Sequence, residues 1–259
     1  MAIPGGSIIV AGAGPTDGTG GAILLLLFAQ GQRPGVDSLA DLAAQGGDGV
    51  GFTLSHLPGD GGNWVELLAG GLTYDCHGLA PGDPLAVPGK GALLGLESVP
   101  AGEAIGLGPA PHLAEGMAMV PVVRVLAGLG AELARLPGVE AVYWHPAHCW
   151  MAVDYYRRVV GSWLGGGAFP ALGLTSLQRE PDGAMVSVGL ALLTGQELRF
   201  EPDRTLAPAA VARIAVRLIH SLIESGPLSH RSEAEGPEGE RLVIEPVRRG
   251  RQLRVTLRR

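Results

Sequence analysis

The chain has 259 residues, which suits one large domain or two modest ones, and its formal net charge is −6. Hydrophobic residues make up 46% of it and charged residues 17%, which excludes a disordered chain of low hydrophobicity. The negative charge makes nucleic acid an unlikely partner. Cys76 and Cys149 are too few for a disulfide framework, and a bond between them is disfavoured in a reducing cytoplasm.

The only long apolar run near the start, at 22–29, has eight residues and is preceded by no lysine or arginine. That pattern argues against a signal peptide, and the run is far shorter than the roughly 20 residues that cross a bilayer. We therefore expect a soluble, cytoplasmic protein without a membrane partner.

The first half of the chain begins with a glycine-rich stretch, 1–21. It lacks the Lys-Ser/Thr pair of a P-loop, so we expect a flexible N-terminal arm rather than a phosphate cradle. Apolar periodicity and Gly/Pro punctuation then predict the following elements: a buried strand at 23–28, a helix at 37–44 capped by Asp37, strands at 50–57 and 64–75 joined by a turn at 58–63, short strands at 92–97 and 104–107, a helix at 117–136 and a strand at 139–144.

The second half begins with a linking segment, 145–169, that contains a helix at 153–164 ended by glycines. Strand, turn and helix signals then predict these elements: strands at 172–180 and 185–194 about the turn at 181–183, a strand at 197–201, a helix at 208–225, a polar loop at 229–240 and a hairpin of 241–247 with 252–257.

This order of elements is typical of an α+β protein with helices packed on the sheets. The first half follows the ferredoxin-like order β-α-β-β-α-β, and a second antiparallel strand-helix-hairpin unit follows it. The predicted organisation is an arm at 1–21, a ferredoxin-like half at 22–144, an aromatic and histidine-rich linking helix at 145–169 and a C-terminal half at 170–259.

Two segments resemble bacterial proteins that carry domain of unknown function 4261. One is the strand end Ala141-Val142-Tyr143-Trp144, which follows a long helix. The other, 189–200, is similar to that family's pattern of a glycine, apolar residues and then glycine-x-Glu-apolar. The resemblance covers about residues 22–258 and implies an α+β fold, with bacterial conflict or stress as a loose context. It implies no catalytic residues.

Residues 143–156 concentrate aromatic side chains, two histidines and a cysteine. If Pro146 begins a helix, His145 caps it, and His148 and Cys149 project toward one side. The helix dipole and a nearby imidazolium would then favour a thiolate. Asp154 would either orient His148 or be solvated, with the solvated state favoured. This is the hypothesis of a thiol-dependent enzyme.

A zinc-dependent version of that hypothesis adds Cys76 and His77 as a second pair of ligands. The spacing His-x-x-His-Cys matches no known zinc motif, and neighbouring residues on a strand face opposite sides. We therefore expect no metal and no cofactor. The structural alternative is that the aromatic residues pack a domain junction, while His145 caps the helix and His148 is solvated.

Charged residues offer two weaker candidates. Glu197 and Glu201 have the even spacing that places strand residues on one face, where paired carboxylates could do acid–base chemistry. Arg199 shares that face, so an exposed ion-pair cluster is favoured. The C-terminal arginines could contact phosphate, but a charged edge strand also explains them: Arg241, Arg248, Arg249, Arg251, Arg254, Arg258 and Arg259.

The sequence favours a non-catalytic protein that binds another protein, because one aromatic patch on a scaffold without motifs suits protein recognition. The expected binding residues are Trp144, Trp150, Tyr155 and Glu197. The alternative is a thiol- or zinc-dependent enzyme with its site around Cys149, His148 and His145.

Overall fold

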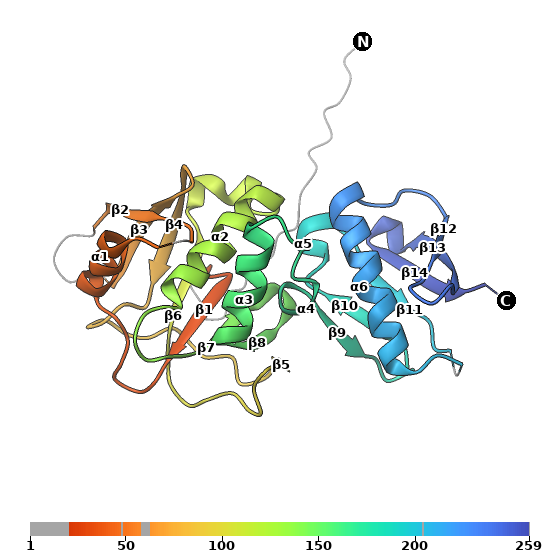
Figure 1. Ribbon diagram of the computed structural model, residues 1–259, viewed down its shortest axis with the longest axis horizontal. Helices are drawn as coiled ribbons and strands as arrows, with labels where there is room; N and C mark the ends of the chain where they lie inside the picture. The colour runs from red at the N-terminus through yellow and green to blue at the C-terminus, as the bar shows by residue number, and fades with distance from the viewer. Residues whose placement is uncertain (1–20, 48, 58–62, 204, 259) are drawn as a thin grey trace, which may run out of the picture.

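A computed structural model of the protein describes residues 21–47, 49–57, 63–203 and 205–258. Residues 1–20 of the expected N-terminal arm at 1–21, and most of the expected turn at 58–63, lie outside these residues. The described chain is a mixed α+β structure in which two mixed sheets lie beside one another and helices pack on them (Figure 1). Buried side chains of both sheets belong to one hydrophobic cluster.

The first sheet has the strand order β2-β3-β4-β6-β1-β7-β8-β5. Its neighbouring strands are antiparallel except β5 and β8, which run parallel. The central strand β1 reads Leu-Leu-Leu-Leu-Phe and is buried on both faces, as a strand covered on two sides must be. The strands are β1 (Leu24–Phe28), β2 (Phe52–His56), β3 (Trp64–Ala69), β4 (Leu72–His77), β5 (Ala92–Leu94), β6 (Glu103–Pro109), β7 (Val139–Trp144) and β8 (Cys149–Ala152).

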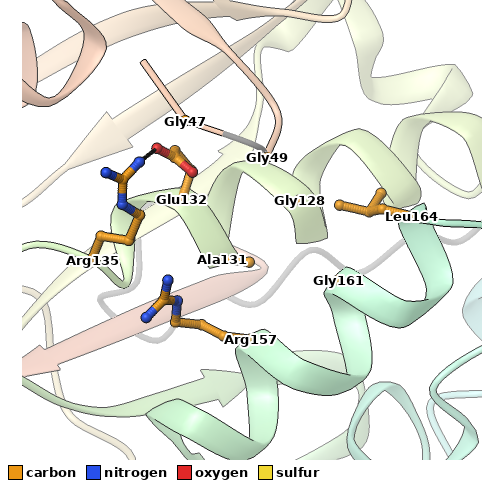
Figure 2. A pocket seen from close by; sticks show the side chains of 9 residues that line it. All are labelled: Gly47, Gly49, Gly128, Ala131, Glu132, Arg135, Arg157, Gly161 and Leu164. Atoms are coloured by element: carbon orange, nitrogen blue, oxygen red, sulfur yellow. Dashed lines mark hydrogen bonds and ion pairs between the residues drawn. The ribbon is translucent and has the colours of Figure 1, made fainter. Parts of the chain in front are cut away.

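The two faces of this sheet are covered differently. Helices α1 (Val36–Gln45), α2 (Val120–Leu133) and α3 (Val153–Leu164) cover one face, where Leu24, Leu26 and Phe28 are buried (Figure 1). Leu25 and Leu27 point to the opposite face, where side chains of the proline-rich segment between β4 and β6 cover them. Helices α2 and α3 lie side by side and line a cleft (Figure 2).

The second sheet has the order β12-β13-β14-β11-β10-β9 and is packed against helix α6 (Pro208–Ser225). The expectation of an antiparallel second unit is corrected, because β11 runs parallel to β14 after the long crossover through α6. The remaining elements are α4 (Ala171–Leu174), β9 (Ser176–Arg179), β10 (Met185–Val188), α5 (Ala191–Thr194), β11 (Glu197–Phe200), β12 (Ser232–Glu235), β13 (Arg241–Val247) and β14 (Gln252–Leu257), with 3-10 turns at Pro111–Gly116, His145–Ala147 and Arg248–Gly250.

Several predicted elements match the structure, among them α3, α6 and the hairpin of β13 and β14. The predicted single strand at 64–75 is wrong. It is divided into β3 and β4 by Gly70 and Gly71, whose φ angles of 56° and 77° suit a tight hairpin turn. Asp37 does not cap α1, whose N-cap is Gly35 without a side-chain hydrogen bond.

Three further corrections concern the second half. Residues 172–175 belong largely to α4, and the strand predicted there begins only at Ser176. The strand predicted at 185–194 ends at Val188, because the chain turns at Gly189 into α5. The polar loop predicted at 229–240 contains the edge strand β12, whose alternating glutamates face solvent.

Candidate functional site

The stretch 143–156 forms a β-hairpin followed by a helix, and the helix predicted to begin at Pro146 is wrong. His145–Ala147 is a single 3-10 turn, and His148 is in the left-handed region at φ 46°. Cys149 then begins β8, which pairs with β7 and so belongs to the first sheet. Backbone pairing with a distant part of the chain, including His145 N donating to Ile23 O at 2.8 Å, outweighs the local helix signal.

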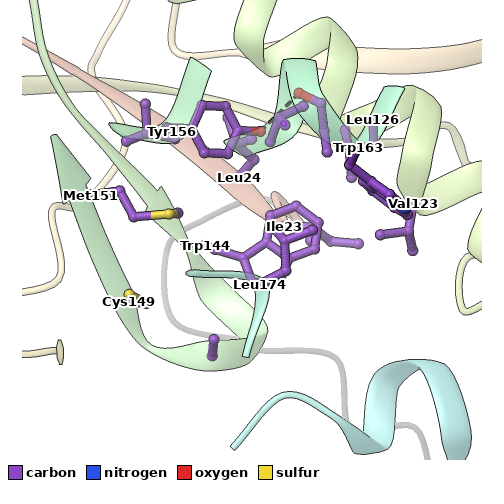
Figure 3. Close-up of a cluster of buried hydrophobic side chains, with 14 of the residues drawn as sticks. Ile23, Leu24, Val123, Leu126, Trp144, Cys149, Met151, Tyr156, Trp163 and Leu174 are labelled. Carbon is purple, nitrogen blue, oxygen red and sulfur yellow. Dashed lines mark hydrogen bonds between the residues drawn. The ribbon is translucent and has the colours of Figure 1, made fainter. Parts of the chain in front are cut away.

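The hairpin sends its large side chains to opposite faces of the sheet, because residues alternate along a strand. Trp144, Cys149 and Met151 lie in the buried cluster beneath the helices (Figure 3). Tyr143 and Trp150 are a cross-strand pair on the other face, with ring centroids 4.7 Å apart. The expectation that Cys149 and His148 share one side is therefore wrong.

Cys149 is fully buried, and its thiol lies 3.7 Å from the carbonyl oxygen of Trp150. Burial raises the pKa of this thiol to about 12, so it is protonated near neutral pH. Cys76 is also a free, fully buried cysteine, and burial together with Asp75 raises its pKa to about 12. Within the described residues, no group of three or more His, Cys, Asp or Glu side chains could hold a metal ion.

The two histidines instead line a cavity of about 330 Å³ on the face opposite the helices. We name it the histidine–tyrosine pocket, and it is lined by Ala86, Val87, Pro88, Gly89, Lys90, Tyr143, His145 and His148. The hydroxyl of Tyr143 lies 3.1 Å from Nδ1 of His148, and the two imidazole rings are 5.6 Å apart. No carboxylate belongs to the described lining, so an incoming ligand meets only neutral or cationic polar groups.

Contacts of the aromatic and imidazole rings hold the walls of the pocket together. Trp150 Nε1 donates to the carbonyl oxygen of Pro88 at 3.2 Å, which ties the loop of residues 86–90 to β8. Tyr143 packs between Trp150 and the edge of His145, whose centroid is 5.9 Å away. Sequence reasoning missed Lys90 and its loop, because they lie more than fifty positions before Tyr143, although Lys90 is the only lysine.

Of the eight predicted site residues, only His145 and His148 line the pocket. Asp154 is exposed in the first turn of α3, and the group that contacts His148 is the hydroxyl of Tyr143. Tyr155 donates from its hydroxyl to Leu172 O at 3.0 Å and lies under the guanidinium of Arg158. Trp144 is fully buried, and its Nε1 has no hydrogen-bond partner within the described part of the chain.

Glu197 holds the turn between β10 and α5. Its carboxylate accepts hydrogen bonds from Gly189 N and Ala191 N, both at 2.9 Å, and from the hydroxyl of Ser187. Burial raises the pKa of Glu197, although these hydrogen bonds oppose the rise. The side chain is therefore part of the internal structure of the second half.

The favoured interpretation of Arg199, an ion-pair cluster, agrees with the structure, because Arg199 pairs with Glu201 and Asp182. Glu197 takes no part in these ion pairs. Two of the C-terminal arginines are also paired, Arg254 with Glu245 at 2.5 Å and Arg258 with Glu233 at 2.6 Å. Paired guanidinium groups offer little to a phosphate backbone.

Residues 189–200 lie against the turn of residues 145–148. Gly189 has a φ of 94°, and a Cβ built there would lie 3.0 Å from backbone atoms of Ala147. The hydroxyl of Ser176 donates to Ala147 O at 2.7 Å in a buried position. The second half of the chain therefore supports the back of the turn that carries His145 and His148.

No family model matches this chain, and no curated protein or solved structure shows significant similarity to it. Among the described residues, no helix combines the length and apolar character required to span a membrane.

Proposed function

We propose that this chain is a non-catalytic binding protein that recognises another protein at the histidine–tyrosine pocket. The observation that carries the proposal is the pocket itself. A tyrosine and two imidazole rings line it, mutual contacts hold them, and the described lining includes no cysteine, serine or threonine. Rigid rings and a cationic side chain are typical anchors of protein recognition.

The polar side chains of the pocket determine which chemical group of the partner fits there. The described lining contains one lysine, two histidines and one tyrosine as its polar side chains. These groups donate hydrogen bonds to an anion, and charge-assisted bonds are the stronger kind. The fitting partner group is thus the carboxylate of an Asp or Glu side chain.

The edge strand β5 follows Lys90 closely, and its open edge suits a partner segment in extended conformation. It is the last strand of the first sheet and pairs only with β8 in the described chain. Ala92 N donates to His148 O at 2.8 Å, so strand alternation turns the N–H of Leu93 away from β8. Leu93 is also 38% exposed, and an open edge of this kind accepts an added strand.

The hypothesis of a thiol- or zinc-dependent enzyme has no support from this geometry. The thiol of Cys149 is protonated, buried and on the opposite face of the sheet from His145 and His148. Two buried free cysteines suit the reducing cytoplasm, which we keep as the proposed location.

We further propose that the first half is an elaborated ferredoxin-like fold related to domain of unknown function 4261. The strand order β7-β1-β6-β4, with α1 after β1 and α2 after β6, supports the fold. The hairpin of β2 and β3 is then an insertion beside β4. The relationship is supported by the sequence pattern of residues 189–200, in which the carboxylate of Glu197 bonds back to Gly189 N and Ala191 N.

The test uses the full chain as bait in an extract of its own organism, with chemical cross-linking and mass spectrometry, followed by affinity measurement with the purified partner. His148→Asn keeps the left-handed backbone that Asn tolerates, and Lys90→Glu reverses the charge. We expect each to weaken binding by at least about tenfold. Leu93→Pro removes the N–H offered to an added strand and is expected to do the same.

The matched control is His112→Gln, because His112 is bonded to Thr73 on another part of the first sheet. It is expected to bind like the wild type. The proposal is wrong if the wild type captures no partner under cross-linking, or if the pocket variants retain partners as well as the control does.

A further inference from the structure

A second cleft lies on the helical side of the first sheet. The cleft between α2 and α3 has a volume of about 460 Å³, larger than the histidine–tyrosine pocket (Figure 2). It lies on the opposite face of the sheet from that pocket and shares no residue with it. Its lining consists of Gly47, Gly49, Gly128, Ala131, Glu132, Arg135, Arg157, Gly161 and Leu164.

An ion pair between Glu132 and Arg135 lies at one end of the cleft. Glu132 is only 6% exposed and is neutralised by Arg135, whose Nη1 also donates to Gly46 O at 3.0 Å. Both of these bonds use the same nitrogen. Within the described chain, no protein group pairs with Nε or Nη2 of Arg135.

Arg157 supplies a second guanidinium at the same end of the cleft. Figure 2 shows its side chain extending from α3 toward the region of Ala131 and Arg135. Among the described residues it has neither an ion pair nor a side-chain hydrogen bond, whereas its neighbour Arg158 lies over the ring of Tyr155 at 5.6 Å. The charges of Arg135, Arg157 and Glu132 leave the described lining with one net positive charge.

The rest of the cleft is formed by backbone and small apolar groups. A Cβ built on Gly161 would meet no atom within 4 Å, so open space lies over this part of α3. Leu164 and Ala131 add apolar surface. A ligand that fits therefore combines an anionic group at the arginines with a compact apolar body above Gly161.

We propose that this cleft binds a small organic anion, either a carboxylate or a phosphate ester, through Arg157 and the free nitrogens of Arg135. Guanidinium groups match the geometry of both anions with paired hydrogen bonds. The volume falls within the range of pockets that hold small molecules. The site does not depend on the partner proposed for the histidine–tyrosine pocket.

Titration calorimetry of the full chain with benzoate, phenyl phosphate and benzamide tests the charge requirement. Benzamide has nearly the shape of benzoate without its charge, so we expect it to bind at least about tenfold more weakly than the better of the two anions. The ratio of benzoate to phenyl phosphate affinity identifies which anion the site prefers. Equal affinity for benzoate and benzamide, or no heat from either anion at about 10 mM, overturns the proposal.

Variants then place the bound anion in the cleft. Arg157→Gln is expected to lower the affinity by about tenfold or more, because it removes the charge and keeps the length of the side chain. Gly161→Leu is expected to fill the open space and abolish binding, with circular dichroism showing that the fold is kept. Arg158→Gln is the matched control and is expected to leave the affinity unchanged. Unchanged affinity in both Arg157→Gln and Gly161→Leu also overturns the proposal.

Discussion

Replacing Glu197 by alanine tests whether this carboxylate is an internal structural group. Its two oxygens accept three hydrogen bonds, from Gly189 N, Ala191 N and the hydroxyl of Ser187. The Ser187 oxygen in turn accepts from Leu198 N at 2.7 Å, which links the turn to β11. Truncation therefore leaves three donors without their acceptor in a largely buried place.

The expected loss follows from those three donors. A buried donor without its partner costs about 1–3 kcal/mol, and entry of water and relief of the buried charge offset part of this. We expect Glu197→Ala to lower the free energy of unfolding by about 4 kcal/mol. Glu197→Gln keeps an oxygen for both backbone N–H groups and should cost only about 1 kcal/mol, since one hydroxyl bond must reverse.

Urea unfolding followed by tryptophan fluorescence measures these differences, because Trp144, Trp150 and Trp163 are buried. Glu201→Ala is the matched control directly after the same strand, since its partner Arg199 keeps a second ion pair with Asp182. Its cost should be within about 0.5 kcal/mol. A cost below about 1 kcal/mol for Glu197→Ala would refute the structural role.

Three further predictions concern pH, thiol chemistry and helix packing. Because burial raises the pKa of Glu197 above its usual 4.5, the stability from its protonated form is complete below pH 4.5 and is lost as the pH rises through the folded-state pKa. Urea titrations from pH 4 upward should show this fall in the wild type and not in Glu197→Gln; identical pH profiles would contradict it. Cys149, with a pKa of about 12 against a usual 9.0, should react with a disulfide reagent about a thousandfold more slowly at pH 8 than an open thiol, and fully only in urea. Fast labelling of the native protein would show that this is wrong. Gly161→Ala should raise the free energy of unfolding by about 0.5–1 kcal/mol, because its Cβ meets open space in a helix interior. Gly128→Ala should lower it, because its Cβ would lie 2.4 Å from Cγ2 of Val50, and effects of the same sign would contradict the packing described.

Local signals in the sequence were sufficient for elements whose pattern is repeated over several turns. The apolar positions of α3 and α6 recur at helical spacing, and glycines follow both helices, so their bounds were predicted as observed. The hairpin of β13 and β14 was found from alternation. The division of 64–75 at Gly70 and Gly71 was missed, because the apolar residues on either side appear as one run.

The unusual composition of residues 143–156 is sufficient to locate the candidate site in the sequence. It does not predict how the side chains of the site are arranged. Pro146 after His145 is a normal helix start, and nothing local distinguishes it from the observed 3-10 turn. The free energy gained by pairing β8 with β7, and by burying Trp144 and Cys149 beneath the helices, decides between the two.

The sequence by itself determined the α+β class, the long helices and the place where unusual side chains gather. Only the tertiary structure decided that Cys149 faces the core while His148 meets Tyr143, and that Lys90 completes their pocket. It also brought Arg157 to the cleft beside Arg135. The reason is physical: periodicity reports the burial of one element at a time, whereas the neighbours of a side chain depend on which distant strands and helices bury their apolar surfaces against each other.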